Sequence, residues 1–186
     1  MTVTPREDCP LVGPSEPGVQ AGLDFLHRHY DLVHGSAVVP EAFMHGFVRR
    51  RQQIGQLEIL AAIVPYLSVP SLLAGREVLH WIDNTSAKAA LVHGYSGVPD
   101  SARLVHAFHA QNLGLQARVW LEWVPSEANP SDEPSRVDLS SDVWRVCGPI
   151  CSRPVPVLFP LSRAWSDVEG WAREAARAAR ARPELW

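Results

Sequence analysis

The sequence predicts an α/β fold with a mostly parallel sheet, and three observations support this prediction. Residues 77–83, "EVLHWID", and residues 116–125, "QARVWLEWVP", are rich in the β-branched and aromatic residues that form strands. The segments before and between these two runs carry apolar residues at helical spacing. Strands that alternate with helices in this way are typical of parallel sheets.

The first core helix is expected over residues 49–67, "RRRQQIGQLEILAAIVPYL". Four apolar residues in it recur at helical spacing: Ile54, Leu57, Ala61 and Val64. Pro65 is expected to kink or end this helix, because proline has no N–H to donate. A short strand is expected earlier, over residues 36–40, and a helix over residues 19–35.

The strand over residues 77–83 has the apolar character of a buried strand, which comes from Val78, Leu79, Trp81 and Ile82. A helix is expected to follow over residues 85–93, with Asn84 or Thr85 as its N-cap and Gly94 at its end. Asp83 then lies at the carboxyl end of a strand. In open α/β sheets, ligands bind at that edge.

A further helix is expected over residues 101–114, ended by Gly114, and the strand over residues 116–125 follows it. Along that strand, Val119, Leu121 and Trp123 alternate with Arg118, Trp120 and Glu122. In the segment after it, "NPSDEPSR", Asn129 is expected to cap a helix whose first residue is Pro130.

These elements divide the chain into four predicted regions. Residues 1–18 are expected to be disordered or extended, and residues 19–140 to form the α/β domain. Residues 141–165 are rich in proline and are expected to be an extended linker. Residues 166–186 are expected to form a C-terminal helix, which a capping box from Ser166 to Glu169 begins.

Bulk composition excludes several classes of protein. The 186 residues carry a net charge of −3, so there is no global basic signal for nucleic-acid binding. Three cysteines do not make a disulfide framework, and free thiols in a reducing compartment, cytoplasmic or nuclear, are expected. The apolar run over residues 57–75 is interrupted by Glu58, Pro65 and Pro70, so no membrane span is expected there.

Three carboxylates in separate elements form the candidate site. Glu58 lies within the apolar run "GQLEILAAIV", Asp83 ends a strand, and Asp132 follows Asn129. Each also has a structural interpretation: a first-turn acid of its helix, a turn residue, or part of a capping box, respectively. If the three carboxylates lie close together, they repel one another, and a bound divalent cation removes that repulsion. Mg²⁺ is such a cation and prefers oxygen ligands. Two such ions can drive phosphodiester hydrolysis.

The chain resembles the ribonuclease H-like domain that lies beside retroelement reverse transcriptases. The resemblance rests on "IGQLEILA", "WIDNTSAKAAL" and "VPSEANPSDEPSR" and covers about residues 36–136. It implies a ribonuclease H-like mixed sheet flanked by helices, and two Mg²⁺ ions held by Glu58, Asp83 and Asp132. The implied activity is hydrolysis of the RNA strand of an RNA–DNA hybrid, and Asn84 and Arg136 would position the substrate backbone.

The sequence departs from the family pattern at its start. The opening strand or hairpin, with the Asp that is the family's first metal ligand, is not found in the sequence. Asp24 lies in a helical pattern, and Asp31 has no Ser or Gly next to it. Three interpretations stay open: a fragment of a longer polyprotein, an inactive copy, or an unusual substitute within residues 1–35.

Nucleic-acid contacts are expected from one basic cluster, Arg49, Arg50 and Arg51, just before the Glu58 helix. Its structural alternative is a solvated helix start. Two functions follow: an Mg²⁺-dependent nuclease acting on RNA–DNA hybrids, or a non-catalytic remnant of the same fold that binds nucleic acid or another partner. His80 and His93, on either side of Asp83, are expected to be structural.

Overall fold

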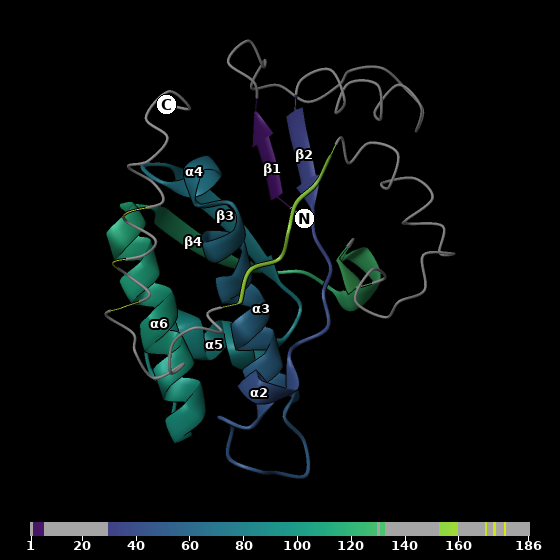
Figure 1. Cartoon of the computed structure of the whole chain (residues 1–186), viewed down its shortest axis with the longest axis vertical. Coiled ribbons are helices and arrows are strands. Elements are labelled where there is room, and N and C mark those ends of the chain that lie inside the picture. Colours follow the sequence, from purple (N-terminus) through teal and green to yellow (C-terminus); the bar gives the residue numbers. More distant parts are fainter. Residues whose placement is uncertain are drawn as a thin grey trace. The chain divides into compact units, whose positions relative to one another are not determined.

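A computed structural model describes residues 2–5, 30–129, 131–132 and 153–159, and the single residues 170, 173 and 177 (Figure 1). The protein is mixed α/β, with helices and a small parallel sheet. The chain divides into two compact units. The first unit comprises Met1–Ala37 and Ser126–Pro156, and the second comprises Val38–Pro125 and Val157–Trp186.

The first unit contains a small mixed sheet in the order β1-β2-β5. Strand β1, Thr2–Pro5, pairs antiparallel with β2, Tyr30–His34, and β2 pairs parallel with β5, Arg153–Pro154. The Val155 N–H continues this pairing by donating to the His34 carbonyl at 2.8 Å.

One prediction for this unit is wrong at the described residues: the helix expected over residues 19–35 is replaced there by the strand β2. β1 lies in the segment expected to be disordered or extended, and β5 lies in the expected extended linker. Each strand is short, with two to five residues, so its pattern is too brief to be recognised locally. Pairing with distant partners, and the burial of Val33, select the extended conformation instead.

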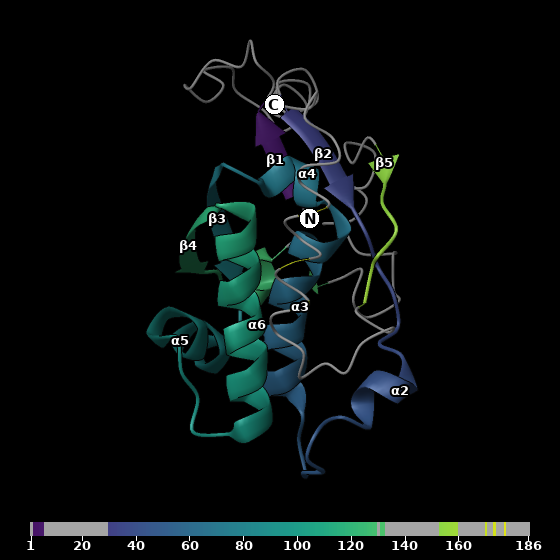
Figure 2. The same cartoon turned by 60° about the vertical axis from the view of Figure 1, so that its left-hand side comes forward.

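The second unit alternates helices and strands, as predicted. Its elements are α2 (Glu41–Met44), α3 (Ile54–Ser68), α4 (Pro70–Leu73), β3 (Glu77–Ile82), α5 (Thr85–His93), α6 (Pro99–Leu115) and β4 (Arg118–Trp123). Strands β3 and β4 are parallel, in a register that runs from Glu77 opposite Arg118 to Ile82 opposite Trp123. Helices α3 and α6 lie side by side, as Figures 1 and 2 show.

The boundaries of α3 differ from the prediction at both ends. The helix begins at Ile54 rather than at residue 49, and it continues through Pro65 to Ser68. Pro65 lies in the last turn, where the Val69 N–H donates to the Pro65 carbonyl at 2.9 Å and closes that turn. Residues 36–40, the expected strand, form no strand, and α2 follows them.

The expected caps of α5 are confirmed. The Asn84 side chain accepts a hydrogen bond from the Ala87 N–H at 2.9 Å, and Gly94 ends the helix in the left-handed region with φ of 69°. Helix α6 was expected to stop at Gly114, but it continues to Leu115. Gln116, with φ of 55°, takes the left-handed position there instead.

Strands β3 and β4 form a sheet with one open face, although β3 was expected to be buried. On the covered face, His80 contacts Tyr66 of α3 and Phe108 of α6. Successive side chains along a strand point to opposite faces. The other face therefore carries Leu79, Trp81 and Trp120, which are 56%, 53% and 69% exposed.

A ring cluster fills the centre of the second unit. The Tyr66 hydroxyl and His80 Nδ1 lie 3.1 Å apart, and the two rings stack. Phe108 packs edge-on against both rings. Burial raises the pKa of Tyr66 and lowers the pKa of His80 to about 4, so the imidazole is neutral at pH 7. His80 is structural, as predicted.

The His80 cluster predicts a loss of stability in acid. An unfolded His with its pKa near 6.5 binds a proton more readily than His80 in the folded chain, whose pKa is about 4. This contribution to stability is therefore present above pH 6.5 and is lost as the pH falls toward 4. Between pH 7.5 and pH 5 the loss is about 2 kcal/mol. Urea unfolding across this range measures it, and His80→Asn is expected to flatten the slope. An equal slope in the variant would contradict the assignment.

Residues 157–159, within the expected linker, pack on the second unit. The Leu158 N–H donates to Ser68 Oγ at 3.0 Å, and the Phe159 ring lies 6.5 Å from that of Phe43. In the region expected to form the C-terminal helix, the described residues Gly170, Arg173 and Arg177 are helical. Within the described part of the chain, no helix is both long enough and apolar enough to span a membrane.

Candidate functional site

Asp83 lies at the carboxyl end of β3, where the sequence predicted it. It is half-buried and directly precedes Asn84, the N-cap of α5. Two bonds from the end of β4 hold the surrounding backbone: the Trp123 indole N–H donates to the Asp83 carbonyl at 3.1 Å, and the Val124 N–H donates to the Ile82 carbonyl at 3.1 Å. The backbone that carries the Asp83 carboxylate is thus fixed at the carboxyl edge of a parallel strand pair.

A second carboxylate on this sheet, Glu122 of β4, was not predicted as a site residue. It lies opposite Trp81 in the register and forms an ion pair with Lys88 of α5 at 2.7 Å. The hydrogen bond from Lys88 lowers the pKa of Glu122 to about 2. Lys88 is the chain's single lysine. Only the parallel register of β3 and β4 brings this pair together, and a local pattern does not reveal it.

Glu58 lies five residues into α3 and is half-buried. Its structural alternative, a first-turn acid, is not supported, because the first turn of α3 contains no acidic residue. Helix α3 packs against α5, which begins directly after Asp83. The helices that carry or adjoin these two carboxylates are therefore packed neighbours within the second unit.

Asp132 belongs to the first unit, whereas Glu58 and Asp83 belong to the second. Two hydrogen bonds to Asn129 form the turn that leads to Asp132. The Asn129 side chain accepts a bond from the Ser131 N–H at 3.1 Å, and its carbonyl accepts one from the Asp132 N–H at 3.1 Å. This agrees with the prediction that Asn129 caps the segment. Pro130, the helix beyond Asp132, and Arg136 lie outside the described residues.

The basic cluster is partly neutralised. Arg50 Nη2 lies 2.7 Å from Oδ1 of Asp100, a residue that is 1% exposed at the start of α6. Asp100 also accepts from the Val48 and Ser101 N–H groups, each at 3.0 Å. Arg49 and Arg51 are exposed. Of the three arginines of the predicted cluster, Arg50 is thus held by Asp100, whereas Arg49 and Arg51 extend toward solvent.

Asn84 was predicted to contact nucleic acid, and its side-chain oxygen serves as the α5 cap. That bond leaves its amide N–H₂ group as the part suited to a phosphate oxygen. Asp31 is the second residue of β2 and therefore lies on a strand. The sequence pattern gave no reason to place it there, because β2 is recognisable only through its pairing with β1 and β5.

The fit of a Mg²⁺ ion can be judged from the donor types and from their grouping. Glu58, Asp83 and Asp132 offer the carboxylate oxygens that Mg²⁺ prefers. Among the residues that the structure describes, no group of three or more His, Cys, Asp or Glu side chains is positioned to hold a metal ion. The donor chemistry fits, and the described geometry does not by itself complete a site.

Comparisons of the chain with protein-family models, with curated proteins and with solved structures found no match.

Proposed function

We propose that the chain is a ribonuclease H-like domain related to those beside retroelement reverse transcriptases, and that it hydrolyses the RNA strand of RNA–DNA hybrids. The observation that carries the proposal is Asp83 at the carboxyl end of β3, beside the parallel strand β4 and directly before a capped helix. Ligands bind at this edge of parallel sheets. The order of Glu58, Asp83 and Asp132 along the chain supports the same family.

In this proposal, Glu58, Asp83 and Asp132 would hold Mg²⁺, which would supply an activated water and charge stabilisation of the leaving oxygen for phosphodiester cleavage. The chain's own groups bind and orient the substrate. The Asn84 amide and the exposed residues Arg49 and Arg51 contact phosphates, and Arg136 has the same role by resemblance.

Asp31 is the candidate for the family's first Asp. It lies on a strand that has an antiparallel and a parallel neighbour, and it precedes Glu58 by 27 residues. This position supports the interpretation that the first 35 residues supply an unusual substitute for the opening strand.

A second candidate function is a non-catalytic interaction module of the same fold. The open sheet face with Leu79, Trp81 and Trp120 favours it, because contiguous exposed apolar surface is typical of interaction sites. The net charge of −3 is also unusual for a protein that binds nucleic acid through phosphates.

Cleavage of matched substrates distinguishes these two functions. The purified chain is incubated with Mg²⁺ and an end-labelled RNA–DNA hybrid, with an RNA duplex and a DNA duplex of the same sequence as comparison substrates. The proposal predicts cutting of the RNA strand in the hybrid, and its loss in EDTA. An intact hybrid after incubation with a folded chain would favour the interaction module.

A further inference from the structure

The edge of β4 that points away from β3 has no strand beside it in the part of the chain that the structure describes. In a parallel pair, alternate residues direct both main-chain groups toward the neighbouring strand. The Arg118 N–H donates to the Arg76 carbonyl at 2.8 Å, so the even-numbered residues of β4 face β3. The N–H and C=O groups of Val119 and Leu121 therefore point outward.

This free edge is short, because the donors at its two ends are bonded within the chain. The Ala117 N–H donates to a carbonyl of α6, and the Trp123 N–H donates to the carboxylate of the residue before it, each at 2.9 Å. Between them, the outward groups of Val119 and Leu121 have no backbone partner among the described residues. The bonded and the free positions are thus placed symmetrically about Trp120.

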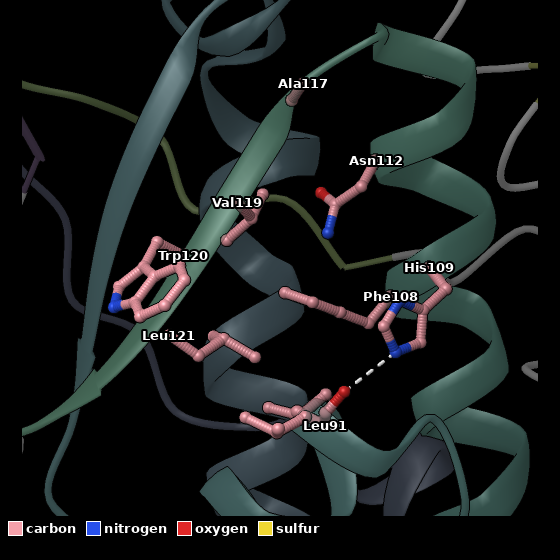
Figure 3. A pocket seen from close by; sticks show the side chains of 9 residues that line it. Leu91, Phe108, His109, Asn112, Ala117, Val119, Trp120 and Leu121 are labelled. Atoms are coloured by element: carbon pink, nitrogen blue, oxygen red, sulfur yellow. Dashed lines mark hydrogen bonds between the residues drawn. The ribbon is translucent and has the colours of Figure 1, made fainter.

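A pocket of about 310 Å³ lies along this edge, between α5, α6 and β4 (Figure 3). Successive side chains of a strand point to opposite faces, and Figure 3 shows Leu121 on the side of Phe108 and the Trp120 ring on the other side. Because Val119, Trp120 and Leu121 all line the pocket, the edge of the strand itself bounds it. The pocket therefore leaves room beside β4 for the side chains of an added strand.

The centre of this edge lacks the features that protect edges in natural sheets, which are charged residues, proline and bulges. None of residues 119–121 is charged or proline. Trp120 and Val92, which line the pocket, are 69% and 56% exposed. An unprotected edge beside exposed apolar side chains is typical of a surface that another strand covers.

We infer that this edge pairs with the same edge of a second copy of the chain, antiparallel and about a two-fold axis at Trp120. Each Val119 then lies opposite Leu121 of the second copy. Such a pair exchanges two main-chain hydrogen bonds, so the two pairs around the axis form four bonds. The result is a continuous sheet in the order β3-β4-β4-β3, to which each copy contributes the same residues.

Charge complementarity favours a second copy as the occupant of this edge. With Trp120 on the axis, Arg118 lies opposite Glu122 of the second copy, and opposite charges that face each other across strands are stabilising. Within its own chain, Arg118 pairs with Glu77, and Glu122 pairs with Lys88. Positive and negative groups therefore alternate across the axis, and their charges cancel. A nucleic acid strand, which binds to net positive charge, does not match this edge.

Trp120 occupies the position where side chains of the two copies lie closest. In an antiparallel pair this is the position without main-chain hydrogen bonds, and aromatic residues that face each other there are stabilising. The contact consists of one short strand and a pocket rim from each copy, which is at the small end of specific interfaces. A dissociation constant on the order of 10–100 μM is therefore expected.

Sedimentation velocity of the full chain, without metal or nucleic acid, tests this inference over about 5–500 μM, a range that suits weak interfaces. The mean sedimentation coefficient is expected to rise from that of a monomer toward that of a dimer. A folded chain that stays monomeric at the highest concentration would overturn the inference.

Trp120→Lys and Trp81→Lys are matched variants that locate the contact. Both add one positive charge to the open face of the sheet, at residues that are 69% and 53% exposed, but only residue 120 meets itself on the axis. Like charges that face each other repel, so Trp120→Lys is expected to weaken the dimer at least about tenfold, and Trp81→Lys less than about twofold. Circular dichroism confirms each fold. Equal weakening by both variants would contradict pairing through the β4 edge.

Mixing two variants tests the position of the axis. Trp120→Glu alone also places like charges opposite each other. An equimolar mixture of Trp120→Lys and Trp120→Glu brings opposite charges together, and it is expected to associate at least about fivefold more tightly than either variant alone. If mixing gives no gain in association, Trp120 does not lie on the axis and the assignment fails.

Discussion

Asp83→Asn is expected to reduce Mg²⁺-dependent cleavage of an RNA–DNA hybrid at least about 100-fold. Loss of a group that merely supports a metal ligand costs 10–100-fold in affinity or activity, and loss of a ligand itself costs at least as much. Asparagine has the shape of aspartate, and the backbone at Asp83 is held by the bond from Trp123. The variant is therefore expected to fold and to lose only the charge.

Glu122→Gln is the matched control for this experiment. Glu122 is also a carboxylate on the β3–β4 sheet, but Lys88 holds it at 2.7 Å. Because the side chains of Lys88 and Glu122 are 26% and 41% exposed, solvent screens the pair, and its removal is expected to cost little stability and to leave cleavage nearly unchanged. Equal losses of activity in Asp83→Asn and Glu122→Gln would show that cleavage depends on negative charge at this edge of the sheet. They would contradict a specific role of Asp83 as a metal ligand.

Asp100→Ala is expected to destabilise the chain by about 3 kcal/mol. Asp100 is 1% exposed and accepts bonds from Val48, Arg50 and Ser101. Burial alone would raise its pKa, but these bonds outweigh burial and hold the pKa below its usual value. Removing the carboxylate leaves the Arg50 charge and the Val48 N–H without their partner. Breaking a buried pair in this way costs about 3–5 kcal/mol, and partial exposure of Arg50 favours the lower end.

Urea unfolding of Asp100→Ala, Arg50→Ala and the double variant measures this effect. The double variant is expected to lose less than the sum of the single losses, because both single changes break the same pair. Additive losses would contradict the assignment of Asp100 as the anchor of residues 48–50. Arg49→Ala is the control at a neighbouring exposed residue, and a change within about 0.5 kcal/mol is expected for it.

The second unit was largely predictable because its signals are local. Apolar residues at helical spacing marked α3, the Asn84 cap and Gly94 marked both ends of α5, and the alternation over 118–123 marked β4. Helix ends were less accurate. Nothing in the residues of α6 shows that Gln116, rather than Gly114, takes the left-handed position, since Leu115 is buried by packing and thereby extends the helix.

The first unit could not be predicted, because its strands depend on partners far away in the chain. β2 pairs with β1, about 30 residues before it, and with β5, about 120 residues after it. The same limit applies to the candidate site. The sequence placed Asp83 correctly from a strand end and a cap. The sequence did not reveal the ion pairs of Glu122 with Lys88 and of Asp100 with Arg50. Each pair joins residues that lie far apart in the chain.

The binding of Mn²⁺, a substitute for Mg²⁺ that electron paramagnetic resonance detects, tests the proposed metal role of Asp83 most directly. The wild-type chain and Asp83→Asn are titrated with Mn²⁺ in the presence of an uncleavable DNA duplex of the hybrid sequence. If Asp83 is a metal ligand, Mn²⁺ binds the wild-type chain saturably and binds the variant at least about tenfold more weakly. Equal Mn²⁺ affinity in the two chains would contradict the claim that Asp83 holds a catalytic metal.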